Sequence, residues 1–120
     1  MGTRESNAYY VWYFLSLLCY NGSMNYNFEW DIDKAKSNIT KHQISFESAT
    51  SIFRDANALS LSDEGHSEDE ERWLTLGIDE VTRILFVVHT YISIDDKSCN
   101  IRIISARKAT QKEQKTYYEG

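Results

Sequence analysis

The spacing of apolar residues changes near residue 56, and this change limits the possible folds more than any other feature. Before it, apolar side chains recur every three or four positions, which is the period of an amphipathic helix. After it, short runs alternate between apolar and polar residues, which is the period of a strand. A chain of 120 residues has room for one hydrophobic core. The sequence therefore predicts one α+β domain in which helices precede a sheet.

Two short N-terminal helices are predicted ahead of the sheet. The first spans residues 31–42, where Ile32, Ala35 and Ile39 form an apolar stripe and an aspartate at the start can cap the helix. The second begins at Ser45 and also carries apolar residues at helical spacing. Its expected buried stripe consists of Phe46, Ala49, Ile52 and Phe53.

Four strands and a closing helix are predicted after them. Polar turns join consecutive strands, which predicts a four-stranded antiparallel sheet, and the third strand is apolar enough on both faces to be central. Thr110 and Glu113 form a capping box that begins a C-terminal helix over residues 111–118. We expect the helices to cover one face of the sheet and to leave the other, in whole or in part, for function. The predicted strands are residues 58–62, 72–76, 83–92 and 100–106.

Residues 1–23 contain an apolar run from Ala8 to Tyr20. The run is too short to cross a bilayer, which takes about 20 residues, and it lacks the flanking charge and cleavage site of a signal peptide. Met24 and the segment after it are typical of a natural start. We therefore expect residues 1–23 to be a non-native or mobile extension, and residues 24–120 to form the domain. An exposed apolar run is prone to pair with a second copy, so it is also a candidate homodimer contact.

Composition and charge narrow the class of protein. A chain with 42% hydrophobic and 26% charged residues is typical of a globular protein rather than a disordered one. Cys19 and Cys99 are too few for a disulfide framework or a metal site, which favours free thiols in a reducing cytoplasm. The net charge of −5 argues against a nucleic-acid ligand, but residues 97–120 carry a local charge of +4. The chain is thus acidic in its middle and basic at its end.

The sequence contains none of the common motifs for cofactor chemistry. Its glycines form no phosphate-binding loop and its three histidines have no zinc-ligand spacing, so we expect no metal and no cofactor. What remains is a set of cationic residues and histidines, most of them at the ends of predicted elements. Metal-free cleavage of RNA uses such groups: a base for the 2′-hydroxyl, an acid for the leaving 5′-oxygen, and cations for the phosphorane. The candidates for these roles are Lys41, His42, His66, Arg72, His89 and Arg107.

Several of these candidates also have a purely structural explanation. Arg107 can pair with the acidic segment as readily as with a phosphate, and Arg72 follows four acidic residues that can pair with it. Alternation places His89 on the face that carries Val87, which favours a hydrogen-bonded core histidine. His66 lies in a polar loop, where it can simply be solvated. By themselves these residues establish an α+β domain and no activity.

Five blocks of sequence between residues 28 and 118 resemble the BrnT family of toxins from bacterial type II toxin–antitoxin systems. Each block is weak alone, but together they follow the order and spacing of the family over about 90 residues. Residues 1–23 have no counterpart in the family pattern. The blocks are Phe28–Asp31, Lys41–Ala49, His66–Arg72, Val87–Thr90 and Arg102–Thr110, the last followed by Glu113 and Tyr117.

The resemblance implies a RelE-like fold and a cytoplasmic endoribonuclease that cuts RNA without a metal and so inhibits translation. It implies mRNA, free or on the ribosome, as substrate, and a BrnA-like DNA-binding antitoxin as partner. Arginines of the candidate set would clamp the phosphate, while its histidines or Lys41 would move protons. The expected RNA-binding residues are Arg102, Lys108 and Lys112.

Arg107 is the strongest single candidate. Strict alternation along the last strand places Arg107 on the same face as Ile101 and Ile103, which predicts that its guanidinium emerges at the rim of an apolar face of the sheet. A function of a different class is also open: a catalytically degenerate toxin homologue that acts only as a co-repressor bound to its antitoxin. Toxicity of residues 24–120 that depends on Arg107 would separate the two hypotheses.

Overall fold

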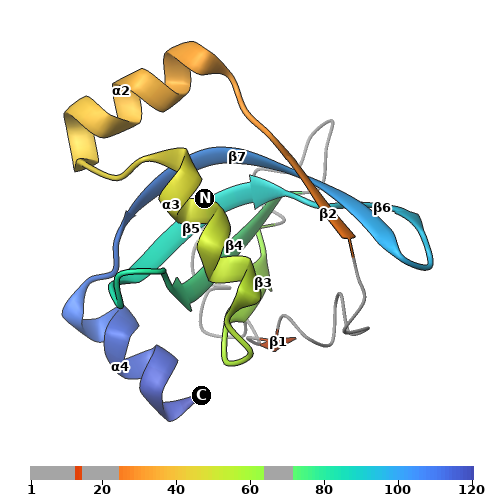
Figure 1. The fold of residues 1–120 in the computed structure, drawn as a ribbon. Helices are drawn as coiled ribbons and strands as arrows, with labels where there is room; N and C mark the ends of the chain where they lie inside the picture. Colours follow the sequence, from red (N-terminus) through yellow and green to blue (C-terminus); the bar gives the residue numbers. More distant parts are fainter. Residues whose placement is uncertain (1–12, 15–24, 64–71) are drawn as a thin grey trace, which may run out of the picture.

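The computed structural model describes residues 13–14, 25–63 and 72–120 (Figure 1). In these ranges a strand precedes the helices, so the chain does not place its helices first. The helices are α2 (Ile32–His42), α3 (Phe46–Thr50), the 3₁₀ helix η2 (Ser51–Arg54) and α4 (Gln111–Glu119). The strands are β1 (Tyr13–Phe14), β2 (Asn25–Glu29), β3 (Leu59–Ser62), β4 (Arg72–Ile78), β5 (Ile84–Thr90), β6 (Ile92–Asp95) and β7 (Ser98–Lys108).

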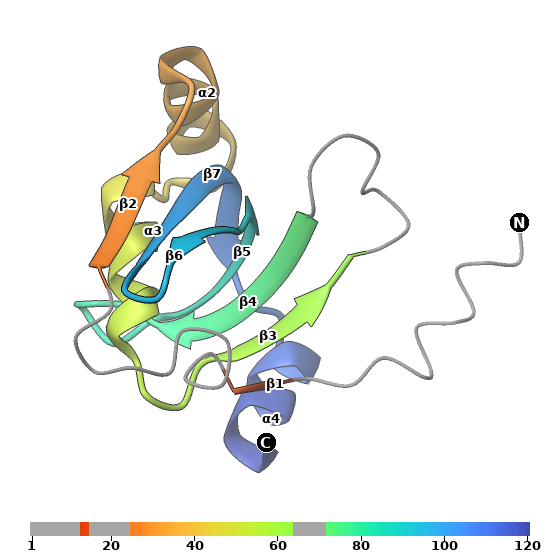
Figure 2. The ribbon, with the colours of Figure 1, turned by 90° about the vertical axis from the view of Figure 1, so that its right-hand side faces the viewer.

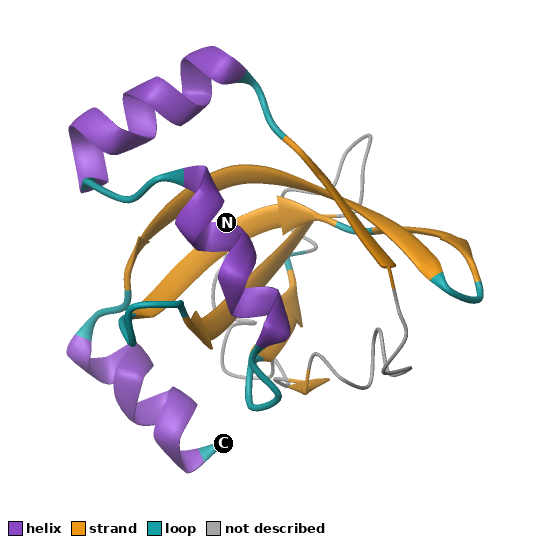
Figure 3. Ribbon diagram, viewed as in Figure 1, coloured by secondary structure: helices purple, strands orange, loops and turns teal. Residues whose placement is uncertain are grey.

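One sheet contains all of these strands (Figure 3). They follow the order β1-β3-β4-β5-β7-β2, and β6 also pairs with β7. The four strands predicted from the sequence correspond to β3, β4, β5 and β7, which are antiparallel neighbours in that order. The prediction of a four-stranded antiparallel sheet is nevertheless wrong, because β1, β2 and β6 extend it and β2 runs parallel to β7. The fold class α+β holds, with a mixed sheet.

β7 is the strand around which the rest of the sheet is arranged. Its eleven residues pair with β5 toward the C-terminal end, and with β6 and β2 on opposite edges toward the N-terminal end. The sequence analysis did not predict β2, although Tyr26 and Phe28 alternate with polar residues in it. Both rings lie on the core face, with centroids 6.0 and 5.5 Å from that of Phe53.

The two faces of the sheet carry different helices (Figure 2). α3 and η2 pack on one face and bury the larger core, which includes Phe46, Ile52 and Phe53. α4 lies on the other side, where Tyr117 packs on Leu76 and donates a hydrogen bond of 2.6 Å to the Asp55 carboxylate. The predicted capping box of α4 is present.

The two helices before β3 differ from the expected pair. α3 has only five α-helical residues and continues as the 3₁₀ helix η2. α2 lies where it was predicted, with Asp31 as its cap, but of its apolar stripe only Ala35 packs against the core. Ile32 is 67% exposed and Ile39 is 50% exposed. The prediction of two N-terminal helices that bury their apolar stripes is therefore correct only for α3 and η2.

Asn38, a polar residue, is the buried contact of α2. Its side-chain amide donates to the Ala106 carbonyl at 2.8 Å and accepts from the Ala106 N–H at 3.1 Å. β2 has already ended at this point of β7, so Asn38 provides the hydrogen bonds that a neighbouring strand would otherwise make. The amide also donates to the Ile44 carbonyl at 2.9 Å, which fixes the start of α3.

Within the described ranges no helix is long and apolar enough to span a membrane. Most of residues 1–23 lie outside these ranges, and so does the predicted loop that contains His66. The described part of the N-terminal segment is β1, which pairs with β3. Cys99 is buried, and Cys19 is not among the described residues.

Candidate functional site

A β-bulge decides which side chains of β7 share a face of the sheet. Val88 of β5 pairs with Ser105, and the next residue, His89, pairs with Ile103. Ile104 is therefore an extra residue that has no partner in this register. Such an insertion shifts the alternation of inward and outward side chains by one position.

The bulge places Arg107 on the face opposite to the one that the sequence predicted. Ile101, Ile103 and Ala106 are all buried on the α3 face, whereas Arg107 lies across from Phe86 on the other face. The prediction that Arg107 shares a face with Ile101 and Ile103 is thus wrong, because strict alternation does not survive a bulge.

The face of the sheet away from α3 presents three of the predicted cationic residues. Strand pairing places the side chains of Arg72, Arg102 and Arg107 on this side. α4 packs against one end of the face, and the remaining side chains are half-buried or exposed. We call this surface the open face. Its residues are Arg72, Leu74, Phe86, Val88, Arg102, Ser105 and Arg107.

The guanidinium of Arg107 is held from two directions. Its two terminal nitrogens donate to the two carboxylate oxygens of Glu113, at 2.9 and 3.0 Å. Its central carbon lies 4.1 Å from the centre of the Phe86 ring, a cation–π distance. Burial would raise the pKa of Glu113, but hydrogen bonds from Arg107 and from the Thr110 backbone outweigh it and lower the pKa below its usual value. Both members of the pair, Arg107 and Glu113, are therefore charged at neutral pH.

These contacts leave one edge of the Arg107 guanidinium available. An arginine has five N–H donors, and here two bond Glu113 while a third donates to the Lys108 carbonyl at 3.2 Å. Among the described residues, the Nε–H and one Nη2–H bond no partner, and they lie on the same edge. The side chain is 34% exposed. A planar pair of donors of this kind can bind two oxygens of one phosphate.

The other two arginines lie farther along the open face. Arg72 pairs across from Thr90 and is half-buried. Standard strand spacing puts its backbone about 16 Å from that of Arg107. Arg102 is exposed and forms an ion pair with Glu29 at 3.1 Å. The three cations are thus spread along one surface rather than gathered at one point.

His89 lies on the α3 face, inside the core, as its alternation with Val87 predicted. Its ring is 1% exposed and meets the Phe53 ring edge-on, with centroids 4.9 Å apart. Desolvation by burial lowers the pKa of His89 to about 4, although the hydrogen bond to the Thr90 backbone opposes the shift. His89 is therefore neutral at physiological pH and out of reach of a substrate, which excludes it from the proton-transfer candidates.

A chain of buried hydrogen bonds fixes the tautomer of His89. Its Nδ1 lies 2.8 Å from the Thr90 carbonyl, which can only accept, so Nδ1 carries the proton. Nε2 must then accept from the hydroxyl of Thr75 at 2.6 Å, and Thr75 in turn accepts from Ser60 at 2.8 Å. These groups satisfy one another's hydrogen-bonding capacity, which indicates a structural role for His89.

The remaining predicted residues lie around the ends of the sheet. Lys41 and His42 are exposed in the last turn of α2, one turn beyond the contact of Asn38 with β7. Lys108 ends β7 and is exposed, and so is Lys112 in the first turn of α4. His66 lies outside the described residues. Arg107, Lys108 and Lys112 thus form one basic region near the junction of β7 and α4.

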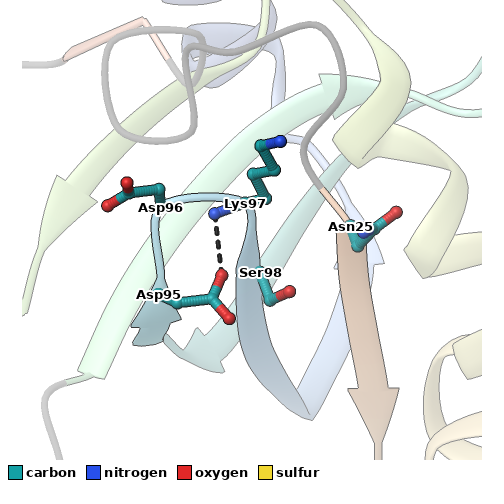
Figure 4. Close-up of a pocket in the computed structure, with 5 residues that line it drawn as sticks. All are labelled: Asn25, Asp95, Asp96, Lys97 and Ser98. Atoms are coloured by element: carbon teal, nitrogen blue, oxygen red, sulfur yellow. Dashed lines mark hydrogen bonds between the residues drawn. The ribbon is translucent and has the colours of Figure 1, made fainter.

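Cavities in the described ranges contain few groups suited to a cofactor. A shallow one of about 520 Å³ lies beside the turn between β6 and β7, lined by Asn25, Asp95 and Lys97 (Figure 4). The Asp95 carboxylate is already used there, because it accepts from the Lys97 backbone at 2.8 Å. In the ranges that the structure describes, no three His, Cys, Asp or Glu side chains gather closely enough to hold a metal ion.

The sequence analysis named Glu113 in the helix cap and in the family resemblance but did not link it to Arg107, and it did not name Phe86. The sequence contains only a weak signal that these two residues contact Arg107, because a bulge decides whether Phe86 faces it. The spacing of Glu113, six residues after Arg107 across a strand end and a helix cap, is the cue that could have linked the two.

Residues 30–113 match the family model described as the ribonuclease toxin BrnT of type II toxin–antitoxin systems. The chain belongs to the BrnT family. The match includes all three arginines of the open face, and it confirms the resemblance seen in the sequence. One solved relative is the ribonuclease toxin BrnT of Brucella abortus, with 20% identity, a TM-score of 0.43, and coverage of 73% of this chain and 100% of the other. No curated protein matches the chain.

Proposed function

We propose that this BrnT-family chain is a metal-independent endoribonuclease that inhibits translation by cutting mRNA, with the cleaved phosphate bound at Arg107. The observation that carries the proposal is the geometry of Arg107. Glu113 and Phe86 fix its guanidinium at the C-terminal end of β7, and one bidentate edge remains for a ligand. A preorganised cation of this kind stabilises the charge that develops on a phosphorane.

The other open-face cations would bind the RNA chain on either side of that phosphate. At about 16 Å from Arg107, the backbone of Arg72 suits a neighbouring phosphate better than the same one. Arg102, Lys108 and Lys112 extend the contact. Because each bound phosphate releases counterions, binding should weaken steeply with salt.

Proton transfer must come from groups that a substrate can reach. Since His89 is buried, the proposed candidates are Lys41 and His42 at the end of α2, together with His66. A general base must approach the 2′-hydroxyl within hydrogen-bond distance, directly or through one water molecule.

A partner antitoxin would silence the enzyme by covering the basic region of Arg107, Lys108 and Lys112. Residues 97–120 carry a net charge of +4, so an acidic or mixed segment of a BrnA-like antitoxin suits this surface. Contacts confined to the opposite, α3 side would contradict occlusion.

RNA cleavage by the purified chain in the presence of EDTA tests the proposal directly. We expect cleavage by the parent, and cleavage slower by about 10²–10³-fold by an Arg107→Ala variant that keeps its fold and its antitoxin binding. Absence of cleavage and toxicity in the parent, with antitoxin binding intact, would favour the degenerate co-repressor instead.

A further inference from the structure

A groove of about 360 Å³ lies beside the open face, where β2 passes into α2. Trp30 and Lys34 line it from the β2–α2 side, and Arg102 and Ile104 line it from β7. Arg102 belongs to the open face, so the groove continues the surface that contains Arg107. Arg107 lies five positions after Arg102 in β7, or about 16 Å of extended chain.

The polar groups of this groove are held in place by contacts of their own. Glu29 pairs with Arg102, and the Asp31 carboxylate accepts from the Lys34 backbone as the cap of α2. Trp30 is half-buried and packs edge-on against Phe46, with ring centroids 5.9 Å apart. The Lys34 ammonium makes no ion pair within the described residues.

An aromatic ring flanked by cations is the arrangement with which proteins bind single-stranded nucleic acid, since bases stack on the ring and phosphates meet the cations. The carboxylates of Glu29 and Asp31 do not oppose this use, because each has an oxygen left to accept from the amino group of a base. Their charges balance those of Lys34 and Arg102, so the attraction of RNA to the groove depends on stacking as well as on charge.

We propose that this groove binds a nucleotide of single-stranded RNA a few positions from the cleaved phosphate, with its base on Trp30 and its phosphate on Lys34 and Arg102. The proposal rests on the ribonuclease function proposed above and extends it to a remote subsite. A remote subsite has a clear kinetic signature: it contributes to long substrates and not to those too short to reach it.

The test compares cleavage of a dinucleotide with cleavage of a single-stranded octanucleotide. For Lys34→Ala and Trp30→Leu we expect kcat/KM on the octanucleotide to fall about tenfold, mainly through KM, and the dinucleotide rate to stay unchanged. Lys36→Ala, two residues farther along α2 and outside the groove, is the matched control. Thermal melts check that Trp30→Leu still folds, and Lys34→Ala leaves the packing of Trp30 on Phe46 intact.

Binding of a 2′-O-methyl octanucleotide, which cannot be cleaved through its 2′-oxygen, is measured in parallel. If the parent binds it and Lys34→Ala weakens binding about tenfold, the subsite stands even where cleavage is absent and the ribonuclease proposal fails. Unchanged octanucleotide kinetics and binding in Lys34→Ala would overturn the subsite, and so would equal losses on both substrates. Competition by a peptide but not by the oligonucleotide would assign the groove to a protein partner and also overturn it.

Discussion

Glu113 of α4 binds the guanidinium of Arg107 in β7 through two hydrogen bonds, at 2.9 and 3.0 Å, while the same carboxylate caps its own helix through the Thr110 N–H. The helix cap and the candidate catalytic cation are thus parts of one network. A charged pair that is one-third exposed contributes little to stability, so its main effect is to orient Arg107.

Replacing Arg107 by alanine should lower RNA cleavage by about 10²–10³-fold, since one preorganised cation is lost from the transition state. Arg107→Lys should recover only part of the rate, because an ammonium cannot bind two phosphate oxygens in one plane. Initial rates on a defined oligonucleotide measure both effects.

Lys115→Ala, an exposed change on the same helix, is the control for this series. Circular dichroism should show that α4 is retained in all variants, since Thr110 still caps it. An Arg107→Ala variant as active as the parent, or one that loses its fold, would show that Arg107 is structural.

Cleavage should persist in excess EDTA, because the proposed mechanism assigns charge stabilisation to arginines. The measurement is the cleavage rate before and after dialysis against the chelator. A rate that disappears with EDTA and returns with added magnesium or zinc would replace this mechanism by a metal-assisted one.

The stability of the fold should decrease as the pH falls from 6.5 to about 4. In this window the unfolded chain takes up a proton at His89 that the folded chain, with its pKa lowered to about 4, does not. The part of the loss that His89 contributes should level off below pH 4, at about 3 kcal/mol, whereas the lowered pKa of Glu113 adds a further loss at lower pH. Urea unfolding at several pH values measures it.

His89→Gln should flatten this pH dependence, and Ser37→Ala, an exposed change that removes no titratable group, should leave it unchanged. The comparison uses the slope rather than the stability itself, because His89→Gln also disturbs the hydrogen bond with Thr75. Equal slopes in the parent and His89→Gln would show that His89 is not the group that titrates.

Asn38→Ala should lower the free energy of unfolding by about 2 kcal/mol, because it leaves the buried N–H and carbonyl of Ala106 without partners. Chemical denaturation measures the free energy of unfolding of this variant and of the control Ser37→Ala, a change at an exposed neighbour. A loss below 0.5 kcal/mol, roughly that of a surface change, would mean that water replaces the amide.

Local pattern was sufficient to predict the elements whose signals are local. Alternation located β3, β4 and β7, and the pairing of Thr110 with Glu113 located the start of α4. The burial of His89 followed from its position in an apolar strand. In each case the deciding residues are neighbours in the sequence.

Long-range features could not be predicted in this way. β2 alternates as clearly as β3 does, but only its partner, 73 residues away, makes it a strand. The bulge that turns Arg107 to the open face depends on the register between β5 and β7. The stripe of Ile32 and Ile39 predicted burial, yet Asn38 faces the sheet because the edge of β7 needs hydrogen bonds.

The parallel pairing of β2 with β7 also has a consequence for how such a chain is made. Asn25–Glu29 leave the ribosome well before their partner, Ser98–Arg102, is synthesised. Contacts between such distant segments form late in folding. Until β7 has been made, a nascent chain lacks both the strand that closes the sheet and the arginine proposed to bind the phosphate. The proposed ribonuclease would therefore be inactive while only its helices and first strands have been synthesised.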